Sequence, residues 1–357
     1  VVVQTLRTDE PEPPAPAIEP EKTLDEVLDE HPISIQVNGE WQTFPNARAA
    51  EEAAYGEYKE NLRRTAENFH ITDDHLGEGG PKAKFQANVE AIKLLKYLEK
   101  TTGQATPEQQ VLSRYVGWGG LADAFDPDKE RWAAEYTQLK ELLTPEEYAA
   151  ARGSTLNAHY TSPTVIRAIY ETVGRMGFET GNILEPSCGV GNFFGMLPEE
   201  MRNSRLYGVE LDSISGRIAQ QLYPKADITV AGFETTDRRD FYDLAIGNVP
   251  FGQYQVRDKA YDKLNFSIHN YFFAKALDQV RPGGVVAFVT SRYTMDAKDS
   301  SVRRYLAQRA ELLGAIRLPN DAFKKNAGAE VVSDIIFLQK RDRPLDIVPE
   351  WTQTGQT

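Results

Sequence analysis

The chain has 357 residues, of which 41% are hydrophobic, an ordinary composition for a globular protein. Its formal net charge of -13 argues against tight, free-standing binding to duplex DNA, because proteins neutralise phosphates with Lys and Arg. No apolar run approaches the ~20 residues of a membrane-spanning helix, and no signal-peptide pattern is present. The only cysteine, Cys188, cannot form an internal disulfide, so we expect a cytoplasmic protein without a membrane partner.

The charge is unevenly distributed. Residues 1–30 contain nine acids against Arg7 and Lys22 and are rich in proline, which predicts a disordered segment or linker. Between residues 292 and 325, eight Lys and Arg stand against four acids. This stretch is the best local candidate for phosphate contact, although a solvated helix face explains it equally well. The candidate residues are Arg292, Arg303, Arg304, Lys324 and Lys325.

Residues 31–155 are predicted to form a hairpin followed by a mainly helical region. Two alternating stretches, Ile33–Val37 and Glu40–Phe44, flank Asn38-Gly39, a strong hairpin signal. Residues 47–68 are predicted to form a polar helix, and Gly77 to Pro81 separates it from a second helix near 82–101, which is predicted from its apolar spacing. Two capping boxes, each with proline at the first helical position, predict further helix starts at Thr106–Gln109 and Thr144–Glu147.

From Thr161 onward, helices alternate with apolar strands, which predicts an α/β domain over residues 156–342 and a tail at 343–357. The predicted strands are Asn182–Glu185, Arg205–Val209, Ile228–Val230, Leu244–Gly247, Val285–Thr290, Leu312–Arg317 and Ser333–Gln339. The predicted helices are Pro163–Met176, Asn192–Leu197, Ser213–Leu222, Ile268–Val280 and Ser300–Arg309. Such alternation favours a mostly parallel sheet with helices on both faces.

Three strand ends carry chemistry-bearing residues. In the stretch Asn182–Phe193, Glu185 ends a strand, and Gly189 and Gly191 then allow the backbone to pass close to a ligand. A second strand ends in an acid within Leu206–Asp212, and a later one ends within Asp243–Phe251 as Asn-Val-Pro-Phe. The glycine turn alone is a weak signal, but the three stretches in this order are specific.

Together these stretches resemble the S-adenosylmethionine-dependent amino-methyltransferases that modify adenine N6 in DNA. The likeness is greatest to the methylase region of large helicase–methylase proteins of bacterial mobile elements, which Tyr115–Leu121 and Ala158–Thr161 also match. It covers roughly residues 109–340. The resemblance implies a Rossmann-like fold of seven strands, the last antiparallel, in a bacterial protein. It also implies a DNA substrate and a helicase region elsewhere in the same parent protein.

The resemblance implies S-adenosylmethionine as the cofactor and assigns residues to it. Glu210 also stands at the spacing expected for an acid that binds ribose hydroxyls, although a solvated strand-end acid fits too. Cys188 is interpreted as a small packed residue rather than a nucleophile. A helix cap is the alternative for the segment before Pro163, and the order of Phe233-Glu234 departs from the family pattern. The predicted cofactor residues are His159, Tyr160, Thr161, Glu185, Ser187, Gly189, Gly191, Glu210, Leu211, Phe233 and Glu234.

Asn248, Val249, Pro250 and Phe251 are the predicted catalytic residues. Two acceptors, the Asn248 side-chain oxygen and the next carbonyl, would favour a pyramidal target amine and expose its lone pair. The aromatic ring would stack on the extruded base. Family members usually carry proline where Val249 stands. A simple turn after a strand is the alternative.

Three further residues are candidates for the base pocket: Tyr254, Asn265 and His269. Trp118 is interpreted either as an exposed aromatic facing the cleft or as an anchor in the helical core. We see no metal-ligand spacing, no phosphate-binding Walker loop and no Ser-His-Asp arrangement, so no metal is expected.

The sequence leaves two other functions open. A protein glutamine or RNA methyltransferase shares an Asn-Pro-Pro-Tyr ending of this kind, although Phe251 favours DNA. A catalytically silent module that uses the fold only for binding is also compatible with Val249 and the acidic charge.

Overall fold

The computed structural model describes residues 32–37, 39–73, 75, 77–101, 103, 105, 109–155, 161–320 and 332–353. These residues separate into two compact units, one up to Arg64 and the other from Thr65 onward.

The first unit contains a β-hairpin and a helix. Strand β1 (Ile33–Val37) pairs antiparallel with β2 (Glu40–Phe44), and the hydroxyls of Ser34 and Thr43 lie 2.8 Å apart across the pair. The alternating pattern therefore predicted both strands correctly, while Asn38 lies outside the described residues. Helix α2 (Ala47–Thr65) follows the hairpin, and its predicted end at residue 68 was slightly too late.

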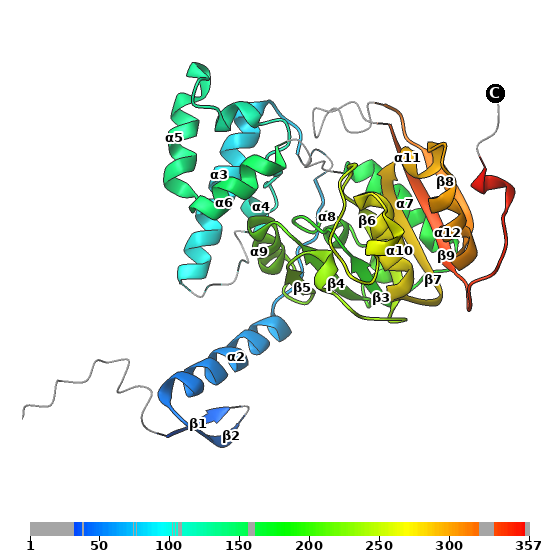
Figure 1. Cartoon of the computed structure of the whole chain (residues 1–357). Coiled ribbons are helices and arrows are strands. Elements are labelled where there is room, and N and C mark those ends of the chain that lie inside the picture. Colours follow the sequence, from blue (N-terminus) through cyan, green and yellow to red (C-terminus); the bar gives the residue numbers. More distant parts are fainter. Residues whose placement is uncertain are drawn as a thin grey trace, which may run out of the picture. The chain divides into compact units, whose positions relative to one another are not determined.

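The second unit contains a seven-stranded sheet in the order β5-β4-β3-β6-β7-β9-β8 (Figure 1). Strands β3 to β7 are mutually parallel, whereas β9 runs antiparallel to both β7 and β8. The predicted Rossmann-like class, with seven strands and the last antiparallel, is confirmed. The strands are β3 (Asn182–Glu185), β4 (Arg205–Glu210), β5 (Asp227–Val230), β6 (Tyr242–Asn248), β7 (Val280–Ser291), β8 (Ala310–Arg317) and β9 (Ser333–Lys340).

Helices cover both faces of this sheet because neighbouring strand residues point to opposite sides. Ile183 packs with α7 and α9, whereas Leu184, the next residue of β3, packs with α10 and α12. The sheet therefore has an apolar interface with the helices on each of its two faces. The helices after residue 161 are α7 (Pro163–Arg175), α8 (Asn192–Gly195), α9 (Ser213–Leu222), α10 (Ile268–Gln279), α11 (Tyr293–Asp296) and α12 (Ser301–Arg309), and short 3-10 turns lie at η3 (Glu199–Met201), η4 (Phe233–Thr235), η5 (Asp262–Leu264) and η6 (Glu350–Thr352).

Two predicted boundaries around the sheet were wrong. Strand β7 begins at Val280, which pairs with Tyr242, so the Pro282–Gly284 stretch lies inside the strand at an irregularity rather than before it. The predicted helix at 192–197 ends at Gly195 instead. The Pro282–Gly284 stretch was interpreted as a turn that precedes the strand, whereas it marks a bulge within β7.

The front of the second unit is helical, as predicted. It consists of α3 (Pro81–Lys100), α4 (Gln109–Leu112), η1 (Ala122–Phe125), η2 (Glu130–Trp132), α5 (Ala133–Leu142) and α6 (Pro145–Ser154). Thr144 forms the predicted capping box with Glu147 at the start of α6. The other predicted box, at residues 106–109, lies mostly outside the described residues.

Trp118 belongs to the core of these helices. It is 1% exposed, and its ring meets those of Phe85, Tyr115 and Phe125 edge-on. The interpretation as an exposed aromatic facing the cleft is therefore wrong, and the core anchor is correct. The glycines beside it accommodate turns, since Gly117 and Gly120 both have positive φ.

Charged side chains join the front helices to the sheet. Arg217 on α9 contacts Glu99 of α3 at 2.9 Å and Glu147 of α6 at 2.5 Å, and Lys96 contacts the same Glu147 at 2.8 Å. Glu147 is buried, so this network is less screened than a surface pair. It holds the front helices against α9, beside the carboxyl ends of the strands.

Candidate cofactor and substrate site

The sheet brings three polar strand ends together at one edge. Glu185 ends β3, Glu210 ends β4 and Asn248 ends β6, and these strands are neighbours in the order β4-β3-β6. The chain order reverses at the β3/β6 boundary, and open α/β sheets bind ligands at such a point, outside the carboxyl ends of the strands.

The turn after β3 depends on two glycines. Gly189 and Gly191 have φ of 55° and 83°, a region that disfavours other residues. A Cβ on Gly191 would collide with the ring of Tyr223, whereas one on Gly189 would meet no atom of the described residues within 4 Å. Gly189 therefore presents bare backbone to open space, and Gly191 is required by packing beneath the turn.

Glu210 closes this turn with its side chain. The backbone N–H groups of Gly189 and Asp212 donate to its two carboxylate oxygens at 2.7 and 2.8 Å. Burial raises the pKa of Glu210 to about 7, although these backbone hydrogen bonds oppose the change. Each oxygen keeps a second lone pair, so the carboxylate can accept further hydrogen bonds from a ligand.

Glu185 lies deeper, at the end of β3. Its side chain is 3% exposed, and its Oε2 has no hydrogen-bond partner among the described residues. Burial, with a smaller effect of the nearby Glu210, raises the pKa of Glu185 well above its ordinary value. Such a buried acid is costly unless a hydrogen-bond donor or a cation satisfies it.

Two cavities open at this edge of the sheet. The larger has a volume of about 460 Å³, within the usual range for small-molecule sites. The smaller, of about 70 Å³, extends toward Thr161 and Glu185. Ser187, Gly189 and Asn248 line both cavities, so Asn248 stands where they meet. Residues of the larger one include Glu210, Leu211, Asp212, Phe233, Glu234, Asn248, Val249, Pro250, Phe251, Tyr254, Val256 and Phe272.

The segment after β6 is held in place by backbone contacts. The Val249 N–H donates to the carbonyl of Val289 on β7 at 3.1 Å, and its side chain is buried. Ser187 Oγ donates to the carbonyl of Asn248 at 3.0 Å. A proline at position 249 would restrict the backbone through its ring but would have no N–H to donate. Valine instead fixes the segment through its backbone hydrogen bond.

Most of the predicted cofactor residues lie at the two cavities. Ser187, Gly189, Glu210, Leu211, Phe233 and Glu234 line the larger one, and Thr161 and Glu185 line the smaller one. Gly191 lies beneath the turn and lines neither. His159 and Tyr160 lie outside the described residues.

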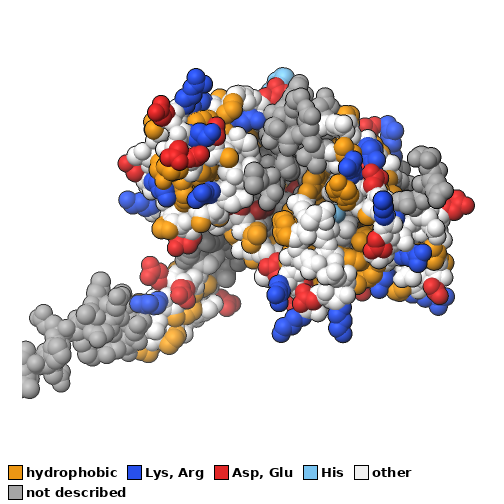
Figure 2. Space-filling view, turned by 45° about the horizontal axis from the view of Figure 1, so that its top comes forward, with side chains coloured by type: hydrophobic (Ala, Val, Ile, Leu, Met, Phe, Trp, Pro, Cys, Tyr) orange, Lys and Arg blue, Asp and Glu red, His pale blue; other side chains and the backbone are white. Residues whose placement is uncertain are grey.

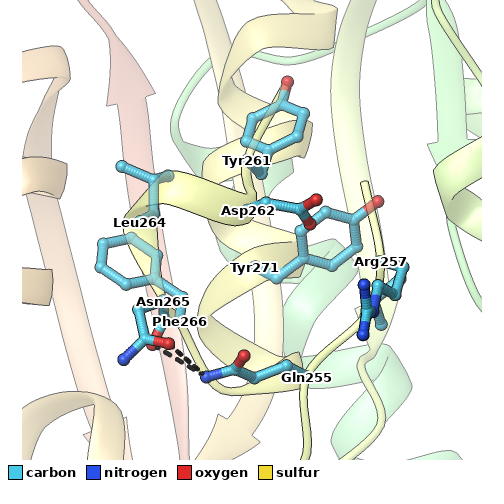
Figure 3. A pocket seen from close by; sticks show the side chains of 9 residues that line it. Gln255, Arg257, Tyr261, Asp262, Leu264, Asn265, Phe266 and Tyr271 are labelled. Atoms are coloured by element: carbon cyan, nitrogen blue, oxygen red, sulfur yellow. Dashed lines mark hydrogen bonds between the residues drawn. The ribbon is translucent and has the colours of Figure 1, made fainter. Parts of the chain in front are cut away.

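The candidates for a base pocket divide differently. Tyr254 lines the larger cavity, whereas Asn265 lines a separate one of about 250 Å³ (Figure 3). His269 lines none of the three cavities, and its buried imidazole contacts Ser267 Oγ at 3.1 Å. Burial lowers the pKa of His269 to about 4, so the ring is neutral at physiological pH.

The front helices contribute cavity residues that were not predicted. Tyr115, Gly117, Gly153 and Ser154 line the larger cavity opposite the strand ends. The glycine-rich stretch around Trp118 was the available signal. The sequence drew attention to its tryptophan, whereas the backbone and the tyrosine before it reach the cavity.

The arginines of the basic stretch differ in exposure. Arg292 and Arg304 are exposed, but Arg303 is 1% exposed and donates to the carbonyls of Thr352 and Ala297 at 2.9 and 2.8 Å. The prediction that Arg303 contacts phosphate was therefore wrong, since its guanidinium secures the C-terminal segment. Lys324 and Lys325 lie outside the described residues. On the face in Figure 2, Lys and Arg are interspersed with Asp and Glu.

Other kinds of site find no support in the part of the chain that is described. No cluster of three His, Cys, Asp or Glu side chains able to hold a metal ion occurs there. Likewise, none of its helices combines the length and apolar character needed to cross a membrane.

No protein-family model matches the sequence. Defense against restriction protein B of Escherichia phage P1 is 27% identical over 271 residues, which are 74% of this chain and 10% of that protein. Type II methyltransferase M.CvrRI of Paramecium bursaria Chlorella virus XZ-6E is 38% identical over 92 residues, covering 26% of this chain and 24% of the enzyme. Type II methyltransferase M.TthHB8I of Thermus thermophilus is 26% identical over 186 residues, covering 47% of this chain and 42% of the enzyme.

The chain is related to type II methyltransferases and to a phage restriction-defence protein. It spans less than half the length of each of these relatives. Among solved structures, a candidate class I S-adenosylmethionine-dependent methyltransferase from Listeria monocytogenes aligns with 17% identity and a TM-score of 0.46, over 75% of this chain and 90% of that one. The strand order β5-β4-β3-β6-β7-β9-β8, with β9 antiparallel, is that of the seven-stranded Rossmann-like methyltransferase fold.

Proposed function

We propose that the chain transfers a methyl group from S-adenosylmethionine to the N6 amine of an adenine extruded from DNA. The observation that carries this proposal is the position of Asn248, which ends β6 and lines both cavities. Because the larger cavity is lined both by Glu210 and by Phe251, an amide that also lines it can contact a target base held beside the cofactor.

The described residues fit S-adenosylmethionine. Glu210 offers carboxylate oxygens to ribose hydroxyls beside the bare backbone of Gly189. Phe233 and Phe272, with ring centroids 4.9 Å apart, supply an apolar wall for an adenine ring. The buried Glu185 oxygen, which has no hydrogen-bond partner among the described residues, suits a positively charged group. When bound, the cofactor supplies an activated methyl group on a sulfonium.

Asn248 and the carbonyl of Val249 would act on the target amine. An aromatic amine is a poor nucleophile because its lone pair is delocalised into the ring. Two acceptors that hold its N–H groups favour a pyramidal nitrogen with an exposed lone pair. Preorganised groups of this kind stabilise the charge that develops in the transition state. The anchoring of Val249 to Val289 and of Asn248 to Ser187 supports such preorganisation.

Phe251 would hold the extruded base. It is partly buried, lies three residues after Asn248 and lines the larger cavity. An aromatic face can stack on any base, and extrusion is required because the reacting nitrogen is otherwise inside the duplex. The names of the type II methyltransferase relatives support DNA as the substrate.

The large size of the phage relative fits a module that works within a longer protein, because this chain matches only 10% of it. We propose that a helicase region of the same parent protein accompanies the methylase. Its help in opening DNA would offset the weak binding expected from a net charge of -13.

The test is transfer of labelled methyl from S-adenosylmethionine to DNA, RNA and protein in parallel, followed by digestion of the product. We expect label in DNA and N6-methyladenine among the digested nucleosides. Label in protein or RNA alone would contradict the substrate. Cofactor binding without transfer to any acceptor would favour a silent module.

A further inference from the structure

A third cavity, of about 250 Å³, lies beside the proposed active site. It is formed by the segment from Gln255 to Phe266, which directly follows the Asn248–Phe251 stretch, and by Tyr271 of α10 (Figure 3). Val256 lines this cavity and also the larger one, so the two cavities are neighbours. The volume is roughly eight times that of a liquid water molecule.

The walls of this cavity combine aromatic faces with polar ends. Phe266, Tyr261 and Tyr271 contribute rings. Gln255 Nε2 donates to Asn265 Oδ1 at 2.8 Å, so the two amides meet at one end of the cavity. Once that bond is made, the Gln255 oxygen and the Asn265 Nδ2 group remain as an acceptor and a donor.

The cavity is built on a rigid support. Asp258 Oδ2 accepts hydrogen bonds from Lys275 Nζ at 2.7 Å and from the Tyr271 hydroxyl at 2.8 Å. Burial raises the pKa of Asp258, but these hydrogen bonds lower it by more, so the pKa lies below its ordinary value. The Ile268 N–H donates to the Tyr254 carbonyl at 2.9 Å and closes the segment at its base. Asn265 adopts a left-handed conformation, with φ of 54°, that aims its side chain at Gln255.

The chemistry of the lining selects a base rather than a phosphate. Arg257 and Asp262 both line the cavity, so their opposite charges sum to zero and an anion would gain little. A nucleobase has two apolar faces and an edge that carries both donors and acceptors. Gln and Asn amides are the side chains best suited to such an edge, above all that of adenine.

We propose that this cavity receives a nucleotide that flanks the target adenine and that Gln255 and Asn265 read its base. This inference rests on the proposed function, because the position of the flanking nucleotide is defined by an adenine held at Asn248–Phe251. The pocket would make the segment after the catalytic stretch part of the sequence recognition of the enzyme.

The first test maps methylated adenines in a DNA pool of randomised sequence, with the full chain and its variants. The wild type is expected to prefer particular neighbours of the target. Gln255→Ala should lose that preference and lower kcat/KM on the preferred sequence by roughly 5- to 150-fold, the scale of one amide–base pair. Gln253→Ala, an exposed glutamine of the same segment that does not line the cavity, should leave both unchanged.

The second test needs no activity. Dissociation constants are measured for duplexes with an abasic site at the target position or at each neighbour in turn, using wild type and Gln255→Ala. At the nucleotide that the cavity holds, the two changes should not add, because each removes the same contact. At every other position they should add.

Additivity at all positions, or non-additivity only at the target adenine itself, would overturn the inference. Absence of DNA binding by the wild type would also overturn it. If methyl transfer fails while non-additivity appears at a neighbour, the proposed reaction fails and the base pocket stands. If methyl transfer succeeds and the effects add at every position, the proposed reaction stands and the base pocket fails.

Discussion

The two halves of the proposed site are built differently, although both lie at the same edge of one sheet. At the cofactor half, Glu185 and Glu210 are carboxylates at the ends of adjacent strands, closed by a glycine turn. At the substrate half, Asn248 is followed by a segment without long helices or strands, fixed by the Asp258–Lys275 pair. The first half depends on strand register and on acids that titrate. The second depends on neutral amides, rings and one buried ion pair.

Lys275 also connects the halves. Besides Asp258, its Nζ donates to the carbonyl of Glu234 at 3.1 Å, next to Phe233 at the wall of the larger cavity. One ammonium group on α10 therefore holds the cofactor wall and the substrate segment at once. The comparison predicts that changes at single residues affect one half, except at Lys275.

The largest effect is expected for Lys275→Met. The Lys275 and Asp258 side chains are only 4% and 11% exposed, so removing the ammonium leaves a buried carboxylate without its charge partner. Breaking such a pair typically lowers the free energy of unfolding by about 3–5 kcal/mol. Denaturant unfolding of wild type and variant measures this change.

The double variant Lys275→Met/Asp258→Asn is the control. An amide keeps an acceptor for Tyr271 and carries no charge, so much of the lost stability should return. A loss of under about 1 kcal/mol in the single variant would show that the pair is as weak as a surface pair.

The next largest effect is expected for Asn248→Ala, on turnover alone. Loss of one preorganised group typically costs about 2.7–4 kcal/mol, or roughly two to three orders of magnitude in rate. The affinity for S-adenosylmethionine should change little, because the amide would act mainly on the target amine. Methyl-transfer kinetics and titration calorimetry measure the two quantities.

Phe251→Ala provides the matched comparison within the same half. It should weaken capture of the extruded base by about 1–3 kcal/mol and so raise the apparent KM for DNA more than it lowers kcat. Wild-type turnover in Asn248→Ala would remove that residue from the mechanism.

These residues also show what the sequence could reveal. The strand ends at Glu185, Glu210 and Asn248 were predictable because strand–helix alternation and glycine turns are local signals, and the carboxyl ends of parallel strands meet at one edge. The burial of Arg303 was not predictable, because its acceptor Thr352 lies 49 positions away in the sequence. Nor was the contribution of Tyr115 and Ser154, since the packing of the front helices on α9 depends on pairs such as Arg217–Glu147 between distant segments.

A smaller effect is expected at the cofactor half. Glu210→Ala should weaken S-adenosylmethionine binding by about 1.5–3 kcal/mol, the scale of hydrogen bonds to a charged group. Affinity should also depend on pH. Because the pKa of Glu210 is raised to about 7, its carboxyl is neutral below that pH and ionised above it. The ionised form accepts from the ribose and attracts the cationic cofactor, so affinity should rise as pH increases through about 7.

Calorimetry across this pH range tests both points. Glu210→Gln should bind weakly and with little pH dependence through about 7, whereas Glu199→Ala, an exposed acid on η3, should behave as wild type. Equal affinity of Glu210→Ala and wild type would show that Glu210 does not bind the ribose.

The smallest effect concerns the exposed arginines beyond the substrate half. With a net charge of -13, the isolated chain should bind duplex DNA weakly and with an affinity that falls as salt rises. Each phosphate contact contributes about 0.9 to the slope of log K against log salt concentration. If Arg292 and Arg304 each contact one phosphate, Arg292→Ala/Arg304→Ala should reduce that slope by about 2.

The control Arg175→Ala/Arg202→Ala removes the same charge from exposed positions on α7 and just after η3. Equal slopes for wild type and the first variant would place phosphate binding elsewhere. Equal reductions in both variants would mean that overall charge, rather than contact at these two residues, sets the salt dependence.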